Sequence, residues 1–166
     1  ALDIHGVAVD PEGHYVIASV NNDDIQVTRI SPTGVHEWTN VYPYFTEEGL
    51  YWNSIAAGPD GILVAGYTMG TGTMSRDGIL VHLDLDGNLL DAQRINAGGS
   101  NAFHTLKAIS DGFIATGRSD LAGNGYDFQL TKLNSVGQIQ WSRTYGGPEW
   151  DWAYEATELA DGGFAM

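Results

Sequence analysis

The side chains of this sequence best suited to ligand binding are aromatic and acidic residues that gather in two short segments. Residues 42–52 and 145–154 each combine tyrosine and tryptophan with aspartate or glutamate. Flat rings beside carboxylates suit sugars, because sugar CH groups pack on a ring face while hydroxyl groups bond to acids. The candidate ligand-binding residues are Trp52, Trp150, Asp151, Trp152 and Tyr154. The alternative is packing between neighbouring sheets, since large aromatic side chains are mostly buried.

Two histidines and a run of oxygen-bearing residues offer other kinds of site. His5 and His104 occupy equivalent positions in the repeat described below, and imidazole suits metal binding or proton transfer, so both join the candidate ligand-binding residues. No cofactor is predicted apart from calcium, for which the candidate ligands are Asn21, Asn22, Asp23 and Asp24. The alternative for Asp24 is that its carboxylate accepts backbone N–H bonds and fixes a loop.

Composition excludes several classes of protein. The chain of 166 residues has 7 Lys plus Arg against 21 Asp plus Glu, a formal charge of −14, and no Cys. The acidic balance argues against nucleic acid and anionic membranes as partners, and no apolar run approaches the roughly 20 residues of a membrane span. Without Cys there is no disulfide scaffold and no thiol nucleophile. Serine-hydrolase, zinc-protease and phosphate-loop motifs are absent from the sequence.

The candidate residues lie in a sequence pattern that is repeated along the chain. A turn glycine recurs with spacings of 48, 51 and 50 residues, at Gly13, Gly61, Gly112 and Gly162. An aspartate recurs out of phase with it, at Asp24, Asp77 and Asp127, with spacings of 53 and 50. Two independent anchors that agree on about 50 residues indicate a structural repeat.

Each repeat unit predicts four short antiparallel strands and almost no helix. The third strand, where apolar and polar residues alternate, is expected at Ile25–Ile30, Ile79–Leu83 and Phe128–Leu133. A four-stranded unit with this period is the signature of a β-propeller blade. A β-sandwich also has short strands, but it would not repeat the same turns at a fixed period. The fold class is therefore an all-β propeller, with blades at about 1–48, 49–100 and 101–150 and the start of a fourth at 151–166.

The third unit resembles a known repeat. Its sequence YDFQLTKLN from Tyr126, WSRTYGG from Trp141 and DGGF from Asp161 is similar to the bacterial and archaeal SBBP-type β-propeller repeat. The second unit departs from that pattern, with Asp91 in place of the tryptophan. The resemblance implies a propeller fold and an extracellular, cell-surface or periplasmic location. It implies no particular chemistry.

The ends of the repeat array predict a missing partner. Three units and two strands of a fourth are present, whereas propellers usually close with about four to eight blades, and an open arc exposes a strand edge. We expect a larger ring, completed by further blades of the same chain or by another copy. The residues expected to need that partner are Val7, Val9, Val16 and Ile17 at one end and Ala156, Phe164 and Met166 at the other.

Three functions are compatible with these observations. The leading hypothesis is an exported or cell-surface propeller that acts, without catalysis, as a structural or binding module for glycans or proteins. The first alternative is a carbohydrate-active hydrolase or lyase that uses carboxylates at the channel mouth. The second is an architectural subunit of a surface layer or filament.

Overall fold

The computed structural model describes residues 3–21, 24–43, 50–69, 76–95, 99–120 and 125–166, without the side chains of Asn21, Leu50, Trp52 and Asn53. The described residues form strands and turns but no helix, so the all-β prediction is confirmed. None of them form a helix with the length and hydropathy needed to span a membrane.

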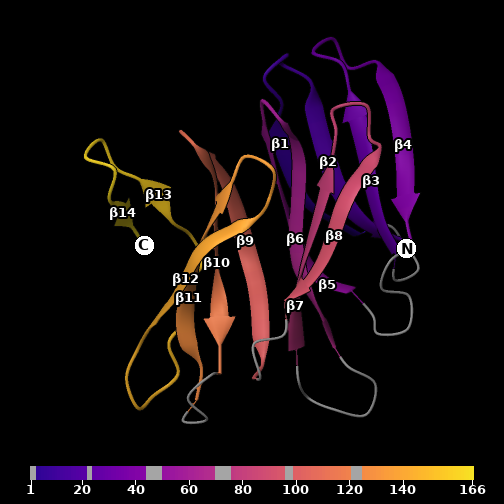
Figure 1. The fold of residues 1–166 in the computed structure, drawn as a ribbon. Helices are drawn as coiled ribbons and strands as arrows, with labels where there is room; N and C mark the ends of the chain where they lie inside the picture. Colours follow the sequence, from indigo (N-terminus) through magenta and orange to yellow (C-terminus); the bar gives the residue numbers. More distant parts are fainter. Residues whose placement is uncertain (1–2, 22–23, 44–49, 70–75, 96–98, 121–124) are drawn as a thin grey trace.

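The described strands form three four-stranded antiparallel sheets and one two-stranded sheet, each ordered as in the chain (Figure 1). The first sheet contains β1 (Asp3–Val9), β2 (Tyr15–Asn21), β3 (Asp24–Ile30) and β4 (His36–Tyr42). The second contains β5 (Leu50–Gly58), β6 (Gly61–Met69), β7 (Arg76–Leu83) and β8 (Leu89–Ile95). The third contains β9 (Asn101–Ile109), β10 (Gly112–Ser119), β11 (Asp127–Asn134) and β12 (Ile139–Tyr145). The fourth contains β13 (Thr157–Glu158) and β14 (Phe164–Ala165).

The predicted third strands are confirmed, since β3, β7 and β11 contain the three expected segments. Each leads into its fourth strand through a hairpin that turns at a glycine with positive φ, a conformation that glycine adopts without strain. The φ values are 85° at Gly34, 81° at Gly87 and 77° at Gly137. We call the end of the sheets with these hairpins the hairpin end, and the opposite end, where β7 begins and β10 finishes, the loop end.

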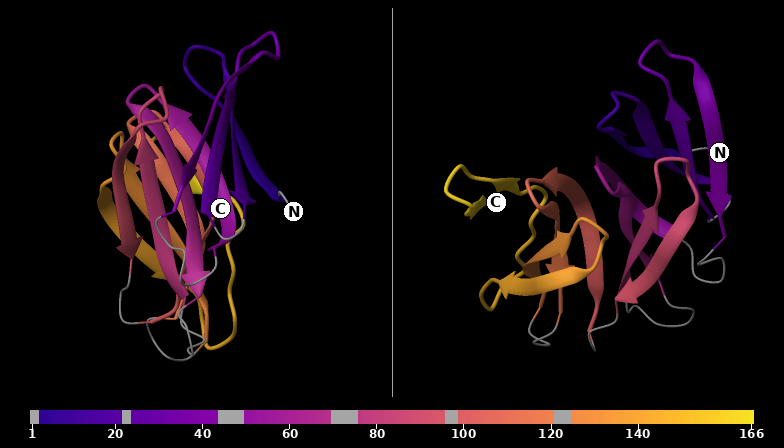
Figure 2. Two further views of the ribbon diagram at one scale, coloured as in Figure 1. Left: turned by 90° about the vertical axis from the view of Figure 1, so that its right-hand side faces the viewer. Right: turned by 45° about the horizontal axis from the view of Figure 1, so that its top comes forward.

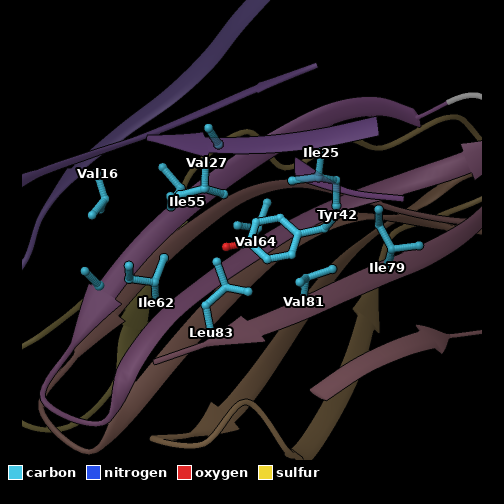
Figure 3. Packing of buried hydrophobic residues seen from close by; sticks show 12 residues of the cluster. Val16, Ile25, Val27, Tyr42, Ile55, Ile62, Val64, Ile79, Val81 and Leu83 are labelled. Atoms are coloured by element: carbon cyan, nitrogen blue, oxygen red, sulfur yellow. The ribbon is translucent and has the colours of Figure 1, made fainter. Parts of the chain in front are cut away.

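The sheets lie side by side in chain order and do not close into a ring (Figure 2). Val16, Val27 and Tyr42 of the first sheet pack against Ile62 and Val81 of the second in one buried core (Figure 3). The opposite face of the second sheet packs in the same way on the third, where Phe103 and Phe113 are buried. Alternation of side chains between the two faces of each strand builds both cores.

The hairpins of the second and third sheets rest on the preceding sheet. The carbonyl oxygen of Gly87 accepts hydrogen bonds from Tyr42 Oη at 2.7 Å and from Asn40 Nδ2 at 3.0 Å. A Cβ on Gly137 would lie 2.9 Å from Leu63, whereas a Cβ on Gly34 would meet nothing within 4 Å. Gly34 of the first sheet therefore has no comparable neighbour among the described residues.

One face of the first sheet is exposed, although the equivalent faces of the next two sheets are buried. Strand pairing makes Tyr15, Ile62 and Phe113 equivalent, because each is paired with the third strand of its sheet at the corresponding position. Their exposed fractions are 43%, 0% and 1%. Val7 and Val9, on the same face as Tyr15, are also exposed. The need of the first sheet for a partner stays a prediction.

The prediction that exposed ends need a partner was wrong for two of the residues it named, Val16 and Ala156. Val16 is fully buried against the second sheet. Consecutive residues of a strand point to opposite faces, so Ile17 shares the exposed face of Val7 and Val16 points the other way. Ala156 is buried against the third sheet beside Leu130. Phe164 joins the same cluster, with its ring 5.9 Å from that of Trp141, while Met166 is exposed.

Candidate binding site

Four side chains at the loop end come from two neighbouring sheets and form two arginine–tyrosine pairs. Tyr67 and Arg76 belong to β6 and β7 of the second sheet. Arg118 belongs to β10 of the third sheet, and Tyr126 directly precedes β11. Tyr67 and Arg118 are equivalent by strand pairing, and Arg76 and Tyr126 each stand one residue before the repeated aspartate. The two sheets therefore carry the same pair with the residue types exchanged.

The two arginines meet at Tyr126. The guanidinium carbon of Arg118 lies 4.5 Å from the centre of the Tyr126 ring, and that of Arg76 lies 5.4 Å from the Tyr67 ring. Nη1 of Arg76 donates a hydrogen bond of 3.2 Å to the hydroxyl oxygen of Tyr126. The ring faces stabilise both cations through their quadrupoles, so one tyrosine joins two positive charges.

A row of aromatic rings continues from Tyr126 along the segment between β12 and β13. Successive ring centres lie 5.4 Å apart from Tyr126 to Trp150, 6.4 Å from Trp150 to Trp152 and 6.3 Å from Trp152 to Tyr154. The Tyr154 ring stacks on His104 of β9 at 6.1 Å. Arg118 also lies 5.1 Å from the Trp152 ring, so the row and the arginine pair form one surface, which we call the arginine–aromatic cluster.

The row is open to solvent. The exposed fractions are 66% for Trp150, 44% for Trp152 and 64% for Tyr154. Tyr154 also lines a groove of about 480 Å³ between β1, β5 and β9, the first strands of the three large sheets. Tyr154, the last ring of the row, is therefore reachable from this groove.

The charges of Arg76 and Arg118 are not balanced by the described part of the chain. Most other described cations form salt bridges, namely Arg29 with Asp10, Arg94 with Asp77, Lys107 with Glu155 and Lys132 with Asp111. Within the described ranges no carboxylate forms a salt bridge with either arginine of the cluster, and the buried Nε of each has no hydrogen-bond partner. An unpaired buried donor costs free energy.

Burial and the two positive charges lower the pKa values of His104 and Arg118. Burial, followed by the charges of Arg118 and Arg76, lowers the pKa of His104 below its usual value of 6.5, which keeps the imidazole neutral at pH 7. Nδ1 of His104 is buried and has no hydrogen-bond partner in the described structure. Burial and the charge of Arg76 likewise lower the pKa of Arg118. A guanidinium starts so far above neutral pH that it stays positive.

The structure brings together four of the seven residues that the sequence suggested for ligand binding, namely His104, Trp150, Trp152 and Tyr154. Trp150 and Tyr154 are mostly exposed and not wedged between sheets. His5 lies exposed on β1, in another sheet, and the side chain of Trp52 lies outside the described residues. Ligand binding by these residues stays a prediction.

Asp151, a further suggested ligand-binding residue, shapes the segment that carries the row. Its backbone N–H donates to the carbonyl oxygen of Tyr126 at 2.6 Å, and its Oδ2 accepts the N–H of Gly147 at 2.9 Å. The first bond ties the segment to the start of β11, and the second closes a turn within the segment, which together hold Trp150 and Trp152 beside the arginine pair.

Most of the suggested calcium ligands lie outside the described residues. The structure describes neither Asn22 nor Asp23, and it describes Asn21 without its side chain. Asp24 begins β3, and its buried Oδ1 has no hydrogen-bond partner in the described structure. The calcium site stays a prediction.

A different acidic group lies at the hairpin end. Asp10, Glu12 and His14 place their ligand atoms within 4.8 Å of one another. Arg29 occupies this group, because Nε donates to Asp10 at 2.9 Å and Nη2 to Glu12 at 2.6 Å. The acidic charge is therefore balanced by a side chain of the protein.

Sequence reasoning missed Tyr67, Arg76, Arg118 and Tyr126. Aligning the units on Asp77 and Asp127 places Arg76 at the position of Tyr126. The change from arginine in one unit to tyrosine in the next was the signal in the sequence. Comparison with known proteins adds no relative, since neither a family model nor a curated protein matches the chain. The resemblance to the SBBP-type repeat stays a prediction from the residues.

Proposed function

We propose that the sheets are blades of a β-propeller that continues beyond the first sheet. The support is the regular face-to-face packing of sheets in chain order and the exposed apolar face that carries Val7, Val9 and Tyr15. Burying a large apolar side chain contributes about 1.5–3 kcal/mol, so covering this face would add appreciably to stability. The occupant is another four-stranded sheet, either from the same chain or from another copy. Light scattering tests this, because a cooperatively folded monomer of residues 1–166 at low concentration would contradict it.

We further propose that the protein is an exported or cell-surface module that binds glycans at the arginine–aromatic cluster. The observation that carries this is the exposed row of Trp150, Trp152 and Tyr154. Exposed rings in a row offer successive faces to the CH groups of a sugar chain, and large exposed aromatic surface on a protein usually marks an interaction site.

Titration of the full chain with oligosaccharides, followed by calorimetry, tests the proposal. Replacement of Trp150 and Trp152 by alanine is expected to weaken binding at least tenfold, while Leu90→Ala, which removes an exposed apolar side chain from β8, leaves it unchanged. Equal binding by both variants would contradict the assignment of the site. The alternatives of an enzyme and of an architectural subunit gain no observation as specific as this row.

A further inference from the structure

We propose that the glycan bound at this site is acidic, and that Arg76 and Arg118 bind the carboxylate of a uronic acid residue while the tryptophans bind the sugar rings. This inference rests on the proposed function, because it names the class of glycan for the same site. Its basis is the charge of two arginines that no described carboxylate balances and that lie in contact with an exposed row of aromatic rings.

The charges of Arg76 and Arg118 favour an anionic ligand. The chain carries 21 acidic residues against 7 basic ones, so carboxylates are abundant for pairing. Nevertheless, no carboxylate of the described part pairs with either arginine of the cluster, while four other cations of the chain are paired. Two half-buried like charges held together by one tyrosine repel each other, and an anion between them removes that repulsion. The site is therefore more stable with an anionic ligand than without one.

The guanidinium N–H donors of the two arginines favour a carboxylate. Arg76 uses Nη1 on the Tyr126 hydroxyl. The Nε atoms of both arginines are buried without a partner in the described structure, whereas the terminal nitrogens of Arg118 are not fully buried and form no hydrogen bond with a described residue. These terminal nitrogens are accordingly the open donors. A planar guanidinium matches the two oxygens of a carboxylate and binds them through two parallel hydrogen bonds.

The aromatic rings and the net charge distinguish an acidic sugar from other anions. A phosphate or a simple acid would use the guanidinium groups but leave the rings of Trp150 and Trp152 without contacts. Nucleic acid would use both, but every nucleotide carries a charge that a chain of charge −14 repels, whereas a glycan needs only one acidic residue at this site. A uronic acid has a carboxylate and an apolar CH face on one ring, so one residue satisfies Arg118 and Trp152 together.

The test uses the full chain and a panel of uronic acid oligosaccharides, each compared with its carboxyl-reduced neutral counterpart. We expect the acidic member of at least one pair to bind at least tenfold more tightly than the neutral one, with a preference that weakens as salt is added. Arg118→Gln is expected to abolish this preference, and Arg118→Lys to retain part of it.

The matched control is Arg143→Gln. Arg143 lies 5.3 Å from the Trp141 ring, so it makes the same kind of cation–aromatic contact outside the cluster. We expect this variant to bind like the unaltered protein. Thermal unfolding of each variant checks that the fold is retained, and the lysine variant keeps the comparison usable if the glutamine variant fails to fold.

The outcomes separate the two proposals. Equal binding of acidic and neutral oligosaccharides, unaffected by Arg118→Gln, overturns the acidic ligand and leaves glycan binding intact. Absence of binding to every member of both series at millimolar concentration overturns both proposals. Binding of an oligoglutamate peptide as tight as that of the best oligosaccharide, and insensitive to loss of Trp150, also overturns the sugar as the ligand.

Discussion

Two arginine sites at opposite ends of the molecule use the same side chain in opposite ways. At the hairpin end, Arg29 donates to Asp10 and Glu12 and lies 3.4 Å from Glu37. At the loop end, Arg118 lies on the rings of Tyr126 and Trp152 and has no carboxylate partner in the described structure. The described residues balance the charge of Arg29 with carboxylates, but they place none beside Arg118.

The pKa values move in opposite directions at the two sites. Burial would lower the pKa of Arg29, but its hydrogen bonds to Asp10 and Glu12 outweigh burial and raise it. For Arg118, burial and the nearby Arg76 lower the pKa, and the surrounding tyrosines do not compensate. The comparison assigns a stabilising role to the Arg29 site and agrees with our proposal of an anionic ligand at the Arg118 site.

The largest expected effect is the loss of Arg29. Arg29→Met leaves the fully buried carboxylate of Asp10 without its cation, and breaking such a pair costs about 3 kcal/mol. Urea unfolding measures the free energy of unfolding. The double variant with Asp10→Asn is expected to recover part of the loss, because no buried charge is left unpaired. A loss below about 1 kcal/mol would mean that the network is only a surface feature.

The second prediction concerns acid stability. Burial alone would raise the pKa of Asp10, but the backbone N–H of His14 and the side chain of Arg29 hold it below its usual value of 3.8. A depressed carboxyl pKa contributes stability that is present above pH 3.8 and is lost as the pH falls through the folded-state value. Unfolding measured between pH 5 and pH 2 should show this loss in the unaltered protein and a shallower one in Asp10→Asn.

The third prediction concerns the stability of the open site. Arg118→Met removes one of two repelling cations and leaves no buried carboxylate without its cation in the described structure, so the free energy of unfolding should change by less than about 1 kcal/mol. The same urea experiment measures it beside Arg29→Met. A loss as large as that at Arg29 would make Arg118 a structural residue and remove the contrast between the sites.

The smallest expected effect comes from His104. Its depressed pKa means that the unfolded chain binds a proton near pH 6.5 that the folded chain does not, so stability falls as the pH drops below 6.5. Arg118 of β10, Arg76 of β7 and the Tyr154 ring face it. His104→Gln should flatten the pH dependence between pH 7 and 5. A bound anionic sugar should raise the His104 pKa, which NMR titration of the imidazole measures.

Much of the fold was predictable because its signals are local. Turn glycines and alternating apolar residues act over a few positions, so β3, β7 and β11 were placed correctly by the repeat. Which face of a strand is buried was harder to predict. Val16 and Ile17 are neighbours in β2, yet only the packing of the second sheet decides that Val16 is the buried one.

The strands and their turns could be derived from the sequence alone, as could the gathering of three aromatic side chains in residues 150–154. That these rings meet two arginines without a described carboxylate partner follows from the tertiary structure alone. Arg76 and Tyr126 are 50 residues apart and come together because the second and third sheets pack face to face. Local patterns fix backbone conformation, whereas a site assembled between sheets depends on register and packing across the chain, which no short pattern contains.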